Sequence, residues 1–322
     1  MEIKIQRGKI LDLNELPEYS IALDGFVQGP VVDTDHHRYS FDHHSNCLRY
    51  CTTATCTQVW TAILLGLDPN KYTVYINDVD IDVCMAIWCL KNPDRCTEPQ
   101  VRRLVEAIGL GDMHAGALPL NGMHKTVEWV SAPQTDSIRN GDYEKLSDSG
   151  LNTIMESIIH RITQYVNGDA SGDIADQETY GNFKIIKNDE NGWALVESQD
   201  PHVYTTLYKA GFDRVIISRP QEDGSNAVSI AKRSDFIDRF PLLKFYTALN
   251  KLEPGWGGST MIGGAPRNND GSRTKLLLDD ICEVLNCVIE NKPITVKKAK
   301  KASKKKSLVK KKTDIEKRAN NE

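Results

Sequence analysis

Short apolar runs alternate with helical stripes of apolar residues through the first half of the chain. Residues 21–23, 31–32 and 72–76 are apolar or alternating runs typical of β-strands, and an acid follows closely after each. Residues 52–65 and 81–90 repeat apolar positions at helical spacing. Strand, acid and helix in this order place ligand side chains at the open end of a parallel sheet. We therefore predict a parallel α/β arrangement here.

The pattern changes in the second half. Apolar runs at residues 183–186 and 193–196, and again at 214–218 and 226–230, flank turn-forming residues, so both pairs predict β-hairpins. The predicted fold class is α/β, with a parallel-sheet domain followed by a smaller mixed α/β domain. The expected divisions are a first domain at 1–130, a linker with a connecting helix at 131–181, a second domain at 182–291, and a disordered Lys-rich tail at 292–322.

Composition narrows the class of protein. The chain has 322 residues, of which 40% are hydrophobic, and no apolar run approaches the ~20 residues of a membrane span. Its N-terminus has no apolar signal core, and its eight cysteines include no Cys-x-x-Cys pair. These features predict a cytoplasmic protein with reduced thiols, without contact with a membrane.

The net charge of −4 is divided unevenly along the chain. Residues 292–322 carry thirteen Lys and Arg against three acids, so the body before them is strongly acidic. Such a body does not resemble a general nucleic-acid binder. The basic tail could contact a polyanion, keep the protein soluble or pair with the acidic body, and the sequence leaves these alternatives open.

Residues 33–44 concentrate the side chains that bind divalent metals. Two Asp-His-His triplets, at 35–37 and 42–44, together with Asp33 put seven carboxylates and imidazoles into twelve residues. These groups hold Mn²⁺, Fe²⁺ or Zn²⁺ at neutral pH, and they repel or compete with one another without a cation. A solvated polar loop is the alternative. Asp78 and Asp80 follow the strand at 72–76, where either acid could instead be a helix N-cap, and Asp112 and His114 lie in a Gly-rich loop.

A glycine-rich segment, residues 253–267, is the second informative stretch. Glycines expose backbone N–H groups to a phosphate, Arg267 could clamp a phosphate, and Trp256 could stack on a base. Alone, the segment is a weak signal, because many glycine-rich loops are turns.

The sequence of motifs resembles the DHH phosphoesterase superfamily. Asp42-His43-His44, with Ser45-Asn46 and residues 52–55 after it, is similar to the central motif of that family, which includes RecJ-type exonucleases, dinucleotide phosphodiesterases and manganese-dependent pyrophosphatases. Residues 228–234, a helix and the double-glycine loop resemble its small substrate-binding domain. The resemblance implies a DHH-type catalytic domain with the active-site cleft between the two domains. Two features depart from the family: only 41 residues precede Asp42, and the usual Gly-Gly-Gly-His is absent.

The motifs and the resemblance together give candidate residues. The metal ligands expected are Asp33, Asp35, His36, Asp42, His43, Asp78, Asp80, Asp112 and His114. The catalytic candidates are His44, His37 and Arg38. The substrate-binding candidates are Lys232, Arg233, Trp256, Gly257, Gly258, Ser259, Gly263, Gly264 and Arg267. The cofactors expected are two divalent cations, Mn²⁺ with Mg²⁺ as the alternative.

The function expected is hydrolysis of a small phosphodiester, such as a short oligonucleotide or a cyclic dinucleotide, by a Mn²⁺-dependent phosphoesterase or nuclease. Trp256 favours a substrate with a base. An inorganic pyrophosphatase or small-polyphosphate hydrolase is the alternative, and it should bring several Lys or Arg side chains to the site. A third hypothesis is a non-catalytic metal or nucleotide sensor. The sequence leaves the oligomeric state open, with a dimer as one option.

Overall fold

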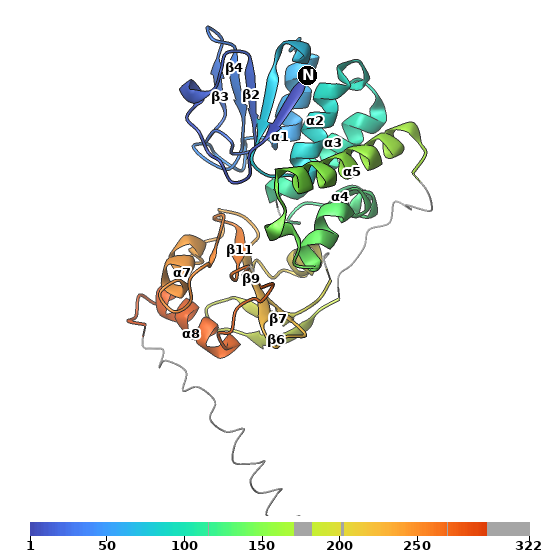
Figure 1. Cartoon of the computed structure of the whole chain (residues 1–322). Helices are drawn as coiled ribbons and strands as arrows, with labels where there is room; N and C mark the ends of the chain where they lie inside the picture. Colours follow the sequence, from blue (N-terminus) through green and yellow to red (C-terminus); the bar gives the residue numbers. More distant parts are fainter. Residues whose placement is uncertain (115, 171–181, 201–202, 269, 295–322) are drawn as a thin grey trace, which may run out of the picture.

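The chain forms a mixed α/β structure with two β-sheets, each of which contains parallel strands, in agreement with the predicted fold class (Figure 1). The computed structural model describes residues 1–114, 116–170, 182–200, 203–268 and 270–294. Parts of the predicted linker, residues 171–181, and nearly all of the predicted tail lie outside these residues.

The first sheet has the strand order β1-β5-β2-β4-β3. Its strands are β1 (Glu2–Ile5), β2 (Ser20–Leu23), β3 (Val31–Asp33), β4 (Arg38–Phe41) and β5 (Thr73–Ile76). Neighbours among β1, β5, β2 and β4 are parallel, whereas β3 adds antiparallel to β4 at the edge. The carboxyl ends of β2, β4 and β5 therefore lie along one edge, where the sequence predicted ligand residues.

Helices cover one face of the first sheet. They are α1 (Thr55–Leu64), α2 (Ile81–Lys91), α3 (Pro99–His114), α4 (His124–Arg139) and α5 (Asp148–Asn167). Short 3₁₀ turns join the elements of this part of the chain, and they are η1 (Leu13–Glu15), η2 (Pro69–Lys71), η3 (Pro93–Arg95) and η4 (Tyr143–Lys145). Because side chains alternate along a strand, Ile21 and Leu23 join the helical core while Ala22 lies on the opposite face, with Phe26. The opposite face is covered by the segment around η1.

Two helices occupy much of the stretch that the sequence assigned to a linker. Leu151, Met155, Ile158 and Ile162 of α5 are buried in the same core as the first sheet. Their spacing of three to four residues puts them on one helical stripe, which explains why α5 packs on the first sheet's helices. This part of the chain therefore belongs structurally to the first core.

The second sheet has the strand order β10-β11-β9-β8-β7-β6. Its strands are β6 (Lys184–Asn188), β7 (Ala194–Glu197), β8 (Arg214–Pro220), β9 (Asn226–Lys232), β10 (Gly257–Gly258) and β11 (Ile262–Gly264). The antiparallel pairs β6–β7 and β8–β9 confirm the two predicted hairpins, and β7 and β8 are parallel. One face carries α7 (Leu242–Leu249) and α8 (Leu278–Ile289), and the other carries α6 (Val203–Lys209).

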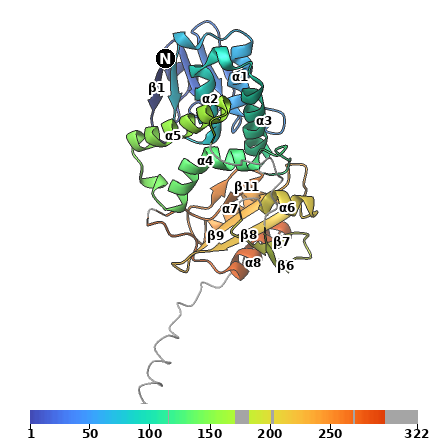
Figure 2. The same cartoon turned by 90° about the vertical axis from the view of Figure 1, so that its right-hand side faces the viewer.

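The second sheet lies below the carboxyl-end edge of the first, with α4 beside the junction (Figures 1 and 2). Side chains connect the two parts: Ala117 packs in the core around α6, and the rings of Tyr50 and Phe236 are 5.1 Å apart. None of the described helices combines the length and the apolar composition needed to cross a membrane.

Candidate metal centre

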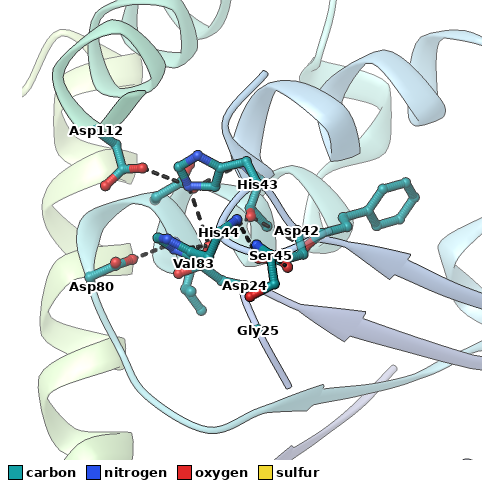
Figure 3. A network of polar contacts seen from close by, with 12 residues as sticks. Asp24, Gly25, Asp42, His43, His44, Ser45, Asp80, Val83 and Asp112 are labelled. Atoms are coloured by element: carbon teal, nitrogen blue, oxygen red, sulfur yellow. Dashed lines mark hydrogen bonds and ion pairs between the residues drawn. The ribbon is translucent and has the colours of Figure 1, made fainter. Parts of the chain in front are cut away.

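A cluster of carboxylates and imidazoles forms at the carboxyl-end edge of the first sheet. Asp24 follows β2, His43 and His44 follow β4, and Asp80 and Asp82 follow β5, while Asp112 comes from the last turn of α3. These residues lie far apart in the sequence, but the parallel strands end side by side, so their side chains converge. Figure 3 shows the Asp112 carboxylate turned toward the His43 ring.

His43 is the centre of this cluster. Its ring is fully buried, and its Nε2 lies 2.7 Å from Asp112 Oδ2, 3.6 Å from Asp24 Oδ1 and 3.8 Å from Asp82 Oδ2. Despite the short contact, neither ring nitrogen of His43 nor Asp112 Oδ2 has a hydrogen-bond partner among the residues that the structure describes. Buried polar atoms almost always have a partner. Ligand atoms that approach one another without forming hydrogen bonds are what a cation site requires.

His44 forms a second branch of the cluster. Its Nε2 lies 3.0 Å from Asp24 Oδ1, and its Nδ1 lies 2.8 Å from an Nη of Arg49. Asp24, His43 and His44 make one group whose ligand atoms lie within 4.8 Å of one another, and His43, Asp82 and Asp112 make another. The two groups share His43. An imidazole nitrogen has one lone pair and binds one cation, so two adjacent cations here would have to share carboxylates rather than His43.

The charges of the cluster are poorly balanced by the protein itself. Burial, and then the charges of Asp24, Asp82 and Asp112, raise the pKa of Asp80 well above its usual range. Burial, with the charges of Asp24 and Asp112, raises the pKa of Asp82 to about 7. Several carboxylates thus compete for too little positive charge in a low-dielectric site.

The pair formed by Asp24 and His44 is the exception to this imbalance. Burial by itself would raise the pKa of Asp24, but its hydrogen bond to His44 and the charges of His44 and His43 outweigh burial and lower it. For His44, burial would lower the pKa, and the hydrogen bond and charge of Asp24 outweigh burial and raise it.

Imidazole and carboxylate donors in this number fit Mn²⁺, Fe²⁺ or Zn²⁺, whereas Mg²⁺ favours oxygen ligands.

Asp42, a predicted ligand, lies in neither ligand group. Its side chain is fully buried, and its two oxygens accept the backbone N–H groups of Gly29 at 2.7 Å, His44 at 3.0 Å and Ser45 at 3.3 Å. These bonds fix the turn that follows β4 (Figure 3). The first residue of the triplet therefore orients the two histidines.

The first triplet lies at the opposite end of β4 from the second. Asp33, Asp35, His36 and His37 form the turn between β3 and β4, so the length of β4, roughly 13 Å for four residues, separates them from His43. His36 Nδ1 pairs with Asp33 Oδ2 at 3.0 Å, and His37 stacks on Tyr19 with a centroid distance of 4.5 Å. The structure does not bring these residues, or Arg38 at the start of β4, to the cluster.

The other predicted ligands have separate environments. Asp78 accepts a 2.6 Å hydrogen bond from the hydroxyl of Tyr143, and Asp80 caps α2 by accepting the Val83 N–H at 2.8 Å. Asp80 nevertheless borders the cluster, as its pKa shows. His114 lies two residues beyond Asp112, and burial, followed by the charge of Arg49, lowers its pKa. The prediction that Asp112 and His114 lie in a Gly-rich loop is wrong, because α3 continues through Gly109 and Gly111 to His114.

Asp82 and Asp24 were not among the predicted ligands. The sequence did carry a signal for Asp24, because this acid directly follows a strand and precedes Gly25. In the structure its positive φ of 51° turns the chain at this point. Asp82 looked like an ordinary acid in the first turn of a helix. Its two oxygens accept the N–H groups of Thr55 at 2.9 Å and Cys56 at 2.8 Å. The N-terminus of α1 is therefore capped by Asp82.

The predicted substrate residues divide into two sets. Gly257, Gly258, Gly263, Gly264 and Arg267 line a cavity of about 820 Å³, and a Cβ on Gly263 would collide with the carbonyl oxygen of Gly257. Ser259 closes the β10–β11 turn by accepting the Ile262 N–H at 3.2 Å.

The remaining predicted substrate residues are held by partners elsewhere. Trp256 is only 3% exposed, and its indole N–H donates to Glu253. Lys232 pairs with Asp235 at 3.2 Å, and Arg233 with Asp213 at 3.6 Å. None of these three side chains lines the cavity.

Comparison with known proteins adds no relative. No protein-family model matches the chain, and no curated protein matches it.

Proposed function

We propose that the protein is a metal-dependent phosphoesterase whose active centre is the cluster around His43. The observation that carries the proposal is the buried contact of 2.7 Å between His43 Nε2 and Asp112 Oδ2, two atoms without a hydrogen-bond partner in the described part of the chain. Around them, Asp24, His44 and Asp82 complete two adjacent ligand groups. Paired divalent-cation sites of this kind are typical of phosphoryl hydrolysis.

The residues have distinct roles in this proposal. Asp24, His43, His44, Asp82 and Asp112 would hold two divalent cations, with Mn²⁺ as the cation proposed. When bound, such cations polarise a phosphoryl oxygen and lower the pKa of a coordinated water toward neutrality. Asp42 keeps both histidines in position through its three backbone hydrogen bonds.

Arg49 supplies positive charge beside the ligands. Its guanidinium donates to His44 Nδ1 at 2.8 Å, and its Nε is buried without a partner in the described part of the chain. A guanidinium fixed there can stabilise negative charge that develops on a phosphoryl oxygen. Because Nδ1 accepts from Arg49, a neutral His44 carries its proton on Nε2 and donates it to Asp24, so Nε2 would bind a cation only after losing that proton. Arg49 therefore both orients His44 and carries charge.

The DHH-type arrangement of two domains is part of the same proposal. Its support is the triplet at the end of a parallel strand and a second sheet whose glycine hairpin lines a cavity together with Ile138 and Glu144 of the first part. Such a centre suits hydrolysis of a phosphodiester and also of a phosphoanhydride. Phosphoanhydride hydrolysis stays as the second candidate reaction because three arginines line the cavity.

Hydrolysis of bis-p-nitrophenyl phosphate, a short RNA and pyrophosphate by the purified protein tests the proposal. Activity should require Mn²⁺ and disappear with EDTA. Asp112→Asn should reduce turnover by about 100-fold or more, because it removes a ligand charge, whereas Asp33→Asn, an acid at the other end of β4, should retain wild-type turnover. Turnover in EDTA, or an Asp112→Asn variant as active as the wild type, would refute the proposal.

A further inference from the structure

The cavity at the junction of the two parts contains an unusual concentration of guanidinium groups. Arg219, Arg267 and Arg273 all line it, together with the glycine hairpin of β10 and β11. From the first part of the chain, Glu144 of η4 and Ile138 of α4 complete the wall. Its volume of about 820 Å³ is large enough for a small ligand.

The geometry of the second sheet presents one of these arginines on the face that bears α6. Along β8, Ile217 packs on the α6 side, and Arg219, two residues later, lies on the same face. An Nη of Arg219 donates to Ser229 Oγ on the neighbouring strand at 3.1 Å. Its guanidinium carbon also lies 6.0 Å from the centre of the Tyr204 ring. Arg219 is thus held in place by the sheet and by α6.

Positive charge exceeds negative charge around the cavity. Among the residues that line it, Glu144 is the one acid, and it lies 3.6 Å from an Nη of Arg267. Burial, and then the charge of Arg267, lower the pKa of Arg273, so these two guanidiniums repel each other. The charges of Glu144 and Asp223 oppose this effect only in part, and no ion pair or side-chain hydrogen bond joins Arg273 to another described residue. An anion in the cavity would offset the repulsion.

The lining also shows what the cavity lacks. No aromatic side chain belongs to its wall among the described residues, and its larger apolar members are Ile138, Val228 and Ile262. Trp256, which the sequence offered as a stacking platform, is buried in the core with α7 and α8. The cavity therefore has the means to bind phosphate charge and no ring on which a base could stack.

One short element connects the cavity with the metal centre. The hydroxyl of Tyr143 in η4 contacts Asp78 and the carbonyl oxygen of Val79, both at 2.6 Å, and these residues directly precede Asp80 of the cluster. The next residue, Glu144, faces the cavity. The same turn thus contacts both the loop that leads to Asp80 and the cavity.

We propose that Arg219, Arg267 and Arg273 form a subsite for a phosphate group of the substrate other than the group that is hydrolysed. The proposal rests on the proposed function, and it makes the substrate a molecule with at least two phosphates, recognised by charge. The second phosphate belongs either to a linear oligophosphate or to the phosphorylated end of a nucleotide. Both present the same tetrahedral oxyanion to the guanidiniums.

Calorimetric titration of the full chain in EDTA tests the subsite separately from catalysis. The ligands are tripolyphosphate, a 5′-phosphorylated dinucleotide and the same dinucleotide without the phosphate. Arg219→Met and Arg273→Met should each weaken phosphate binding by about tenfold or more, since each removes a charged donor. Arg214→Met is the matched control, because the Arg214 side chain donates to the carbonyl oxygen of Asp238 and lies outside the cavity lining.

Two further variants test the charge of the subsite and its independence from the metal centre. Glu144→Gln should tighten phosphate binding several-fold, because it frees Arg267 from its acid. Asp112→Asn should leave binding in EDTA unchanged, so a failed metal centre and a failed subsite give different results. Tighter binding of tripolyphosphate assigns the phosphate to an oligophosphate chain, and tighter binding of the phosphorylated dinucleotide assigns it to a nucleotide. Wild-type protein that binds neither, or that binds the unphosphorylated dinucleotide equally well, overturns the proposal, as do unchanged affinities in both arginine variants.

Discussion

At the residue scale, hydrogen bonding distinguishes Asp42 from its neighbour His43. Asp42 and His43 are neighbours and both fully buried, yet every contact of the Asp42 carboxylate is a backbone N–H, while the imidazole of His43 faces carboxylates. Removing a buried group that satisfies backbone donors costs stability, about 1–3 kcal/mol for each donor left unpaired. Removing His43, whose ring nitrogens have no hydrogen-bond partner among the described residues, instead costs binding of the cation.

Mn²⁺ should raise the melting temperature of the wild-type protein, because a ligand that binds only the folded state stabilises it by about 2.7 kcal/mol at a concentration of 100 Kd. His43→Ala should lose this shift, since both ligand groups share His43. His36→Ala, a histidine of the first triplet, is the control and should keep it. Differential scanning fluorimetry with and without Mn²⁺ measures the shift, and an equal shift in both variants would contradict the assignment.

Arg49→Met should lower turnover while it keeps the Mn²⁺-induced rise in melting temperature. The guanidinium contacts His44 and the carbonyl oxygen of Asp112 but offers no ligand atom to a cation. We expect a loss of about 10²–10³-fold, the range seen when one donor to a developing charge is removed. Arg49→Lys should recover part of the activity. If Arg49→Met lost Mn²⁺ binding instead, the residue would have a purely structural role.

At the element scale, strand ends and caps determine which acids meet. Asp80 and Asp82 lie in the first turn around the start of α2, and one caps its own helix while the other caps α1. The loop that carries them is fixed from the other side by η4, through the hydroxyl of Tyr143. The ligand positions therefore depend on three elements that are distant in the sequence.

Tyr143→Phe should destabilise the protein by about 1–3 kcal/mol, because Asp78 loses a hydrogen-bond donor and the buried carbonyl oxygen of Val79 loses its contact with the hydroxyl. Tyr208→Phe is a matched control, since the buried Tyr208 hydroxyl has no partner within the described residues. That change should be neutral or stabilising. Urea denaturation compares the two free energies of unfolding, and equal losses would show that the η4 contact does not anchor the loop.

Local patterns in the sequence predicted the elements better than the ligand set. Alternation and turn residues predicted the two hairpins and the strands that end at Leu23 and Ile76. A high local content of Asp and His, however, does not show at which end of a strand these residues lie. The first Asp-His-His triplet therefore looked as good a metal-binding candidate as the second. Asp82 could not be selected from sequence, because its position depends on the contact between α1 and α2. The arginines at 219 and 273 gave no signal, because Arg219 reaches the cavity through the register of β8 with β9, and Arg273 comes from the loop between β11 and α8.

At the scale of the whole molecule, two cores meet through few side chains. The first core extends to α5, and the second sheet has a core on each face. Between them, the ring of Phe236 contacts Tyr50, which follows directly on Arg49, although Phe236 is 71% exposed. Such an exposed contact contributes little to stability, but it joins the second part to the segment that carries Arg49.

Phe236→Ala should therefore change catalysis more than stability. We expect a KM several-fold higher with an almost unchanged melting temperature, because the substrate would bind between parts that are less well aligned. Leu243→Ala, at an exposed position on α7, is the control and should change neither quantity. Steady-state kinetics and thermal unfolding of both variants test this prediction. An unchanged KM in Phe236→Ala would show that the contact between Phe236 and Tyr50 does not affect substrate binding.

The central claim is that His43 lies between two cation sites, and anomalous X-ray diffraction from crystals grown with Mn²⁺ tests it most directly. We predict two adjacent anomalous peaks, one bordered by Asp24, His43 and His44 and the other by His43, Asp82 and Asp112. Peaks at the Asp33–His36 turn instead, or no peak beside His43 in crystals soaked with excess Mn²⁺, would contradict the account.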